Sequence, residues 1–176
     1  MSSLRRRLAI AAAGLTVVAG AALGVYRLTD AADATSVGEA VTVYDAQDAR
    51  QVAGTADDVF AGTVMNRAGQ RDIAGILSDL YQVRVERSFK GGLQGTVTVS
   101  SEQGAASLSP GSSYVFATGR VPDQRTHAIL LETKPASFTS LTAPVGAQAA
   151  DEETARRTVA DYWTWAVDHE RDVASG

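Results

Sequence analysis

The chain has no cysteine and very little histidine or lysine, and each scarcity excludes a class of site. Without cysteine, its 176 residues hold no disulfide, no thiolate nucleophile and no thiolate metal ligand. His127 and His169 are the only histidines in the sequence, too few for a zinc site built from a histidine cluster. We therefore expect neither a metal nor a cofactor.

Basic side chains are outnumbered by acidic ones, which argues against a nucleic-acid partner. The formal net charge is −4 at pH 7, whereas domains that bind nucleic acid are basic. Residues 1–29 carry a charge of +4 and residues 30–176 carry −8. The length allows one acidic domain of ordinary size behind a short basic leading segment.

Residues 1–29 have the composition of a signal anchor or a signal peptide. Three arginines, Arg5 to Arg7, precede 19 uncharged residues from Leu8 to Tyr26. As a helix, this run would span roughly 28 Å, close to the hydrocarbon thickness of a bilayer. The arginines predict a cytoplasmic N-terminus, with the residues from about 30 onward outside the cytoplasmic membrane.

Cleavage of this segment is the alternative, and it would release a secreted protein. Small-x-small sites occur at 19–21 and 32–34, but the uninterrupted apolar run favours a retained single-pass anchor. Within the run, Gly20 and Gly24 have the spacing that lets two membrane helices approach closely. Self-association through that face is one structural hypothesis.

The rest of the chain divides into a stalk, a β domain and a terminal helix. Residues 30–40 are small and polar, which predicts a flexible stalk. Residues 41–146 contain short segments of alternating apolar and polar residues, the pattern of half-buried strands. Residues 147–176 predict a C-terminal helix that packs on this domain.

Five strands are predicted in the β domain, after a candidate edge strand at 41–44 and a loop or short helix at 45–57. Gly62 predicts a bulge or sharp bend in the first strand. We expect a polar connection at 66–75, and residues 135–146 show no strong periodicity. The five predicted strands are 59–65, 80–89, 95–100, 114–117 and 127–133.

A single amphipathic helix is predicted from Asp151 to Val173, with Asp151 as its N-cap residue. Its apolar residues recur at helical spacing and form one face. This face consists of Ala155, Val159, Tyr162, Trp163, Ala166 and Val167. The pattern predicts a mainly β fold: a small five-stranded barrel, closed or partly open, with the helix packed outside it and an N-terminal transmembrane or signal helix before it.

Four motifs of the β domain follow one another along the chain: Ala56-Asp-Asp-Val-Phe-Ala-Gly-Thr-Val64, Tyr81-Gln-Val-Arg-Val-Glu-Arg-Ser-Phe-Lys-Gly91, Thr96-Val-Thr-Val99 and Leu108-x-Pro-Gly-x-x-Tyr-Val-Phe-Ala117. This series is similar to that of the OB-type barrel of netrin-like domains and tissue inhibitors of metalloproteinases, including their bacterial relatives. The chain resembles that family over about residues 56–119, which implies an OB-like barrel and a class of binding modules. The animal inhibitors chelate their target's zinc through an N-terminal cysteine that this chain lacks, so the resemblance does not imply protease inhibition.

No residue pattern identifies a catalytic site. Ser112-Ser113 follows Pro-Gly in a turn and lacks the glycine pattern of a nucleophile elbow. Asp57-Asp58 lacks the alternating ligand spacing of a calcium loop and is interpreted as a turn that leads into a strand. His127 is expected at the surface or at a barrel end. His169 is expected late in the helix, where a cation suits the dipole.

Aromatic residues are the candidates for partner contacts. Tyr162 and Trp163 lie on the apolar face of the predicted helix and are assigned to the core. Trp165 lies roughly 200° from Trp163 on an ideal helix and points elsewhere. We name Trp165, Tyr114 and Phe89 as candidate contacts with a partner.

The leading hypothesis is a non-catalytic module, anchored in the membrane, whose extracytoplasmic domain binds a protein or a component of the cell envelope. One alternative is an inhibitor of envelope proteins or an enzyme that acts on them. Another alternative is a structural membrane dimer that forms through Gly20 and Gly24.

Overall fold

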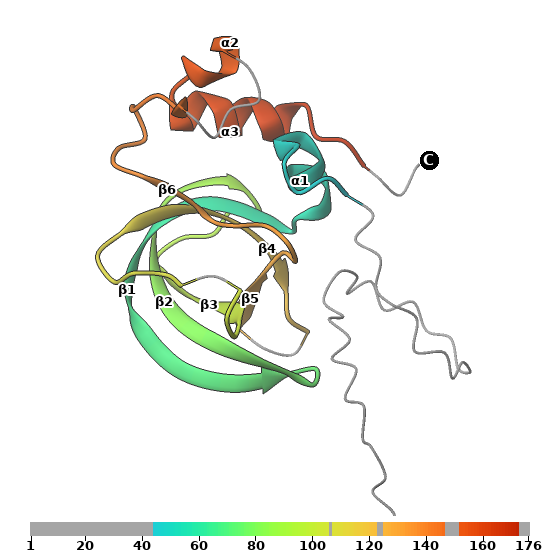
Figure 1. Ribbon diagram of the computed structural model, residues 1–176, viewed down its shortest axis with the longest axis vertical. Helices are drawn as coiled ribbons and strands as arrows, with labels where there is room; N and C mark the ends of the chain where they lie inside the picture. Colours follow the sequence, from blue (N-terminus) through green and yellow to red (C-terminus); the bar gives the residue numbers. More distant parts are fainter. Residues whose placement is uncertain (1–43, 106, 123–124, 147–151, 173–176) are drawn as a thin grey trace, which may run out of the picture.

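The structure, a computed structural model, describes residues 44–105, 107–122, 125–146 and 152–172 (Figure 1). These residues form a mainly β architecture of six strands and three helices. The predicted targeting segment 1–29, the stalk 30–40, Gly20 and Gly24 all lie outside the described residues. In the part of the chain that the structure describes, no helix is long and apolar enough to cross a membrane.

Two long strands form an antiparallel hairpin, β1 (Asp58–Ile73) and β2 (Ile76–Lys90). Ala74 and Gly75 connect them with φ angles of 53° and 85°, as the favoured two-residue hairpin turns require. The prediction of a connection at 66–75 is therefore wrong. This part of β1 is exposed from Met65 to Asp72, so its side chains lack the alternation of a half-buried strand.

The remaining strands complete a sheet in which β1 has neighbours on both edges. β3 (Thr96–Glu102) pairs with β2, and β5 (Thr126–Ile129) runs parallel to β3. β4 (Ser113–Arg120) pairs antiparallel with β5 and also with β1. β6 (Ala136–Phe138) pairs with β4 at its other end. The strand order is β1-β2-β3-β5-β4-β6, with the additional pairing of β1 and β4.

In the second half of the domain one predicted strand is too long, and the structure contains one strand more than the five predicted. The strand predicted at 127–133 ends at Ile129, because the chain turns at Leu130–Thr133, where the Thr133 N–H donates to the Leu130 carbonyl (3.2 Å). β6 lies within 135–146, where the sequence shows no strong periodicity. Its three residues are too few to display an alternating pattern.

The helix predicted at 151–173 is instead two helices, α2 (Glu152–Ala155) and α3 (Val159–Asp168). The chain between them leaves the helical path because its backbone bonds to an earlier loop: the Val145 N–H donates to the Arg157 carbonyl (2.9 Å). Thr158 then caps α3 by accepting from the Asp161 N–H (3.1 Å). The predicted cap, Asp151, lies outside the described residues.

Two apolar cores lie on opposite faces of β1 and β4, because successive side chains of a strand alternate between faces. The helices α1 (Ala49–Thr55) and α3 cover one face (Figure 1), and α1 confirms the helix alternative at 45–57. Strand residues of the helix-covered core are Val59, Ala61, Val115 and Ala117. The opposite core contains Phe60, Val64, Tyr81, Val83, Val99, Leu108 and Phe116.

Gly62 allows β1 and β2 to approach closely. The register of the two strands shifts between Ala61 and Gly62, which confirms the predicted irregularity. A Cβ at Gly62 would lie 2.7 Å from Val83 Cγ1 and 2.8 Å from the Arg84 carbonyl oxygen. The strand pairing therefore leaves no room for a larger residue at this position.

Gly62→Ala is expected to lower the free energy of unfolding by about 2 kcal/mol, since the added methyl group overpacks against Val83 and the backbone of β2. Gly119→Ala is the matched control within β4, because a Cβ there would meet its neighbours only at 3.9 Å. Urea unfolding of the full-length variants measures both changes. Equal losses at the two positions would contradict this packing argument.

Candidate binding cleft

A cleft of about 950 Å³ lies between the sheet and the helices. Its walls come from the start of α1, from β4 and β6, from the turn after β5 and from α3. Such a volume lies at the upper end of the range for ligand sites in proteins. The lining residues are Tyr44, Asp45, Ala46, Gln47, Ala49, Val52, Val115, Ala117, Glu132, Thr133, Lys134, Pro135, Ala136, Ser137, Tyr162 and Trp163.

Three aromatic side chains form part of the cleft wall. The rings of Tyr162 and Trp163 meet edge to face, with centroids 5.6 Å apart. Tyr44 is buried, and its hydroxyl donates to the carbonyl of Leu131 in the turn after β5. Aromatic walls give a ligand both apolar contact area and a polarised ring face.

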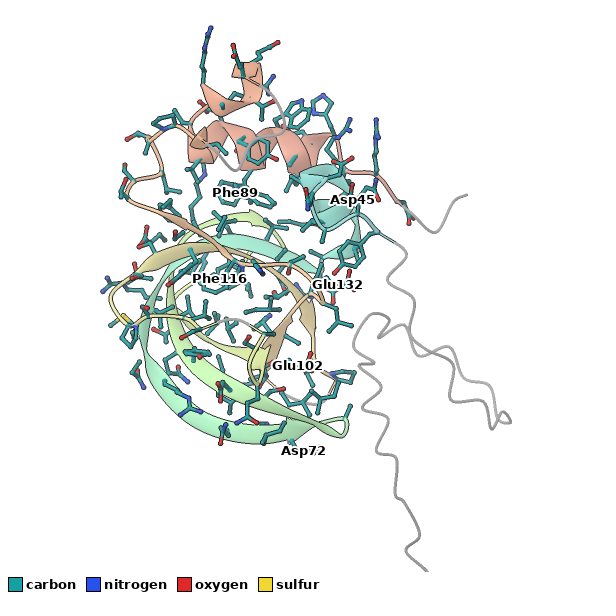
Figure 2. The ribbon with its side chains drawn as sticks, in the orientation of Figure 1. Asp45, Asp72, Phe89, Glu102, Phe116 and Glu132 are labelled. Carbon is teal, nitrogen blue, oxygen red and sulfur yellow. The ribbon has the colours of Figure 1, made fainter. Side chains whose placement is uncertain are left out.

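Charged side chains line the same cleft. Asp45, Glu132 and Lys134 are all exposed, and Figure 2 shows Asp45 and Glu132 on the same side of the molecule. Among the residues that the structure describes, neither Glu132 nor Lys134 forms an ion pair. The cleft therefore combines aromatic contact with charges that are available to a ligand.

The negative charge of Glu132 affects the pKa of Tyr44 in the buried part of the cleft. Burial of the hydroxyl and, secondarily, the negative charge of Glu132 raise the pKa of Tyr44 from 10.0 to about 12. Both effects disfavour the phenolate. Tyr44 consequently stays a neutral hydrogen-bond donor to Leu131 throughout the physiological pH range.

The three predicted partner contacts lie outside this cleft, at separate places. Phe89 packs beneath α3 against the helix-covered core (Figure 2), with the Arg87 guanidinium 5.2 Å from its ring centroid. Tyr114 packs against the opposite core near Phe116, and its hydroxyl accepts from the Ser109 N–H (3.1 Å). The structure therefore does not bring the candidates into one surface.

Trp165 is half-buried and lies in a stack of three rings outside the cleft lining. Its ring stacks on Tyr162 and His169, with centroid distances of 6.2 and 5.6 Å. The guanidinium groups of Arg50 and Arg157 lie 5.5 and 5.0 Å from its ring centroid. Trp163 lines the cleft and Trp165 does not, although both rings contact Tyr162 and both pack against the helix-covered core.

A buried carboxylate, Asp58, brings together charged residues that lie far apart in the sequence. The Asp58 side chain is fully buried and forms a two-pronged ion pair with Arg120, at 2.7 Å to Nη2 and 3.0 Å to Nε. Its Oδ2 also lies 3.0 Å from His127 Nδ1. Asp57 accepts from the backbone N–H of Arg120 (2.8 Å). This Asp58 cluster ties β1, β4 and β5 together.

A carboxylate that holds histidine Nδ1 is also found in catalytic triads, but a triad needs a nucleophile on the other ring nitrogen. Ser113 bonds elsewhere: its hydroxyl donates to the Glu86 carboxylate (3.2 Å) and lies 2.8 Å from the Thr63 hydroxyl. In the described part of the chain, no group of three or more acidic or histidine side chains could hold a metal. Through the contacts of Asp58 with Arg120 and His127, the Asp58 cluster joins three strands.

Sequence reasoning missed Tyr44, Glu132 and the cleft itself. Tyr44 was expected in an edge strand and Glu132 in a strand, yet each lies outside the strands, and residues 41–43 lie outside the described part. A single charged residue in a turn belongs to no sequence motif that could have identified it.

No protein-family model matches the chain, and no curated protein matches it either.

Glu132→Gln is expected to lower the pKa of Tyr44, because the substitution removes the negative charge that opposes the phenolate. Burial remains, so the pKa stays above 10. Alkaline titration followed by phenolate absorbance measures the shift, and Tyr44→Phe identifies its signal. An unchanged titration in Glu132→Gln would contradict the assigned coupling.

The raised pKa of Tyr44 predicts that the folded protein loses stability at high pH. Because the pKa is higher in the folded than in the unfolded state, the contribution of Tyr44 to the free energy of unfolding is fully present below about pH 10. It is lost as the pH rises through about 12. Tyr44→Phe removes this dependence, which unfolding measurements across that window detect.

Gly91→Ala tests the Asp58 cluster. A Cβ at Gly91 would collide with the Asp58 carboxylate, and the residue has a φ of 86°. Gly92 is the matched control, since its φ is 75° and nothing lies within 4 Å of its Cβ. We expect Gly91→Ala to cost about 2 kcal/mol more in unfolding free energy than Gly92→Ala. Equal losses in urea unfolding would show that Asp58 can move away from the turn without cost.

Proposed function

We propose that the chain is a non-catalytic binding module at the outer face of a cytoplasmic membrane. The cleft between α1, the sheet and α3 carries this proposal, because it combines a large volume with aromatic walls and unpaired charges. Its ligand is a protein or another component of the cell envelope. The domain that bears the cleft is acidic, as the charge of −8 over residues 30–176 shows.

An OB-like barrel of the netrin-like type is the fold that we propose for the strands. The pairings run from β1 through β2, β3, β5 and β4 and return from β4 to β1, which supports a closed arrangement. The four motifs of the resemblance fall on or next to β1, β2, β3 and β4. In this proposal the cleft lies outside the barrel, where the helices cover one of its faces.

Membrane anchorage of the domain rests on the sequence of residues 1–29. The uncharged run at 8–26 is long enough to span a bilayer, and the arginines before it favour a cytoplasmic N-terminus. The cleft would then be presented outside the membrane on a stalk of residues 30–40.

Site-specific photo-crosslinking in intact cells tests the proposal. A benzophenone side chain replaces Gln47, an exposed residue in the cleft lining, or Gln103, an exposed glutamine in the turn after β3 that serves as control. We expect an adduct from position 47 and none from position 103. The protein that stays uncrosslinked is expected in the membrane fraction with the mass of the full-length chain. Equal labelling from both positions, or a soluble species that begins near residue 22 or 35, would contradict it.

A further inference from the structure

Glu132 occupies a backbone position that does not suit its side chain. Its φ is 60°, and it is the third residue of the four-residue turn Leu130–Thr133. Positive φ at this place in a turn favours glycine or asparagine, because a Cβ crowds the backbone there. Ala74, the other described non-glycine residue with positive φ, lies in the β1–β2 hairpin turn, which requires that conformation.

The turn therefore holds the glutamate at a cost to stability, and such strain concentrates at functional sites. Its carboxylate is exposed, lines the cleft and has no ion-pair partner among the described residues. The carboxylate of Asp45 lines the same cleft, and within the described part of the chain it accepts only from the backbone N–H of Gln47 (2.8 Å). Among the described lining residues Lys134 is the one cation, against the two carboxylates of Asp45 and Glu132.

The lining also suits a ligand that is extended. A second hollow of about 610 Å³ adjoins the cleft at β6, since Ala136 and Ser137 line the cleft and Ser137 and Phe138 line the second hollow. A polypeptide in extended form presents side chains at alternating positions and can occupy successive hollows.

We propose that the cleft binds an extended polypeptide segment that carries lysine or arginine, with Glu132 as the residue that selects the basic side chain. This inference rests on the proposed binding function and names its ligand class. Trp163 lines the same cleft, where an aromatic ring can attract a cation. The acidic carboxylates of the cleft disfavour an anionic segment in its place.

Binding of synthetic peptides to the full-length protein tests the inference. The probes are the blocked heptapeptides acetyl-(Ala-Lys)3-Ala-amide, its glutamate and glutamine counterparts, and spermidine as a cation without a peptide backbone. Fluorescence anisotropy of labelled peptides gives affinities, and the Trp163 indole signal in NMR reports contact with the cleft. We expect the lysine peptide to bind most tightly, to shift that indole and to weaken at high salt.

Two substitutions of Glu132 separate binding from folding. Glu132→Gln keeps the side-chain shape and is expected to weaken the lysine peptide about fivefold, as for removal of an exposed ion pair. Glu132→Gly relieves the left-handed backbone, so it is expected to raise the midpoint of thermal unfolding while weakening the peptide similarly. Glu102→Gln, in β3 and outside the cleft lining, is the control and is expected to leave affinity unchanged (Figure 2).

The outcomes distinguish this inference from the proposed function. Equal affinity for the three peptides with a Trp163 shift would overturn the selection of basic segments and leave a binding cleft. Spermidine that binds as tightly as the lysine peptide would overturn the polypeptide assignment. Full affinity in Glu132→Gln would overturn the role of Glu132. Failure of the proposed function would instead appear as equal crosslinking from positions 47 and 103.

Discussion

The buried carboxylate of Asp58 is the interaction on which the arrangement of the strands depends. A fully buried charge is costly unless it is paired and hydrogen-bonded, and Asp58 meets both conditions through Arg120 and His127. Those partners come from β4 and β5, so the carboxylate holds three strands at one end of the sheet. It also requires glycine at position 91, where a side chain would occupy its place.

The turn that accommodates Asp58 also connects the sheet to the helices. Lys90, next to Gly91, donates from Nζ to the carbonyl of Ala53 in α1 (2.8 Å) and pairs with Glu170 after α3 (2.6 Å). Since α1 and α3 form two walls of the cleft, one end of β2 positions both of them. The Asp58 cluster and the cleft are thus parts of one framework, in which polar contacts orient the layers and apolar packing stabilises them.

Much of the fold could be predicted because its signals are local. The alternation of Tyr81, Val83 and Val85 indicates a strand without reference to any other part of the chain. Gly62 predicts an irregularity in its strand, which the shift of register between β1 and β2 confirms. The errors share a physical cause, since each concerns a segment whose neighbours decide its structure. Residues 66–72 form a strand through pairing with β2 although both faces are exposed, and residues 156–158 leave the helix to bond with an earlier loop.

The candidate site was less predictable than the fold, because its members are far apart in the chain. Tyr44, Glu132 and Trp163 belong to no motif, and only packing of α1 and α3 against the sheet brings them to one cleft. The same holds for Asp58 and His127, 69 positions apart. By itself the sequence determined the β character, the acidic domain and the absence of cysteine chemistry, since composition and periodicity act locally. Tertiary structure alone decided which charges are buried in pairs and which line the cleft, because that depends on contacts between distant segments.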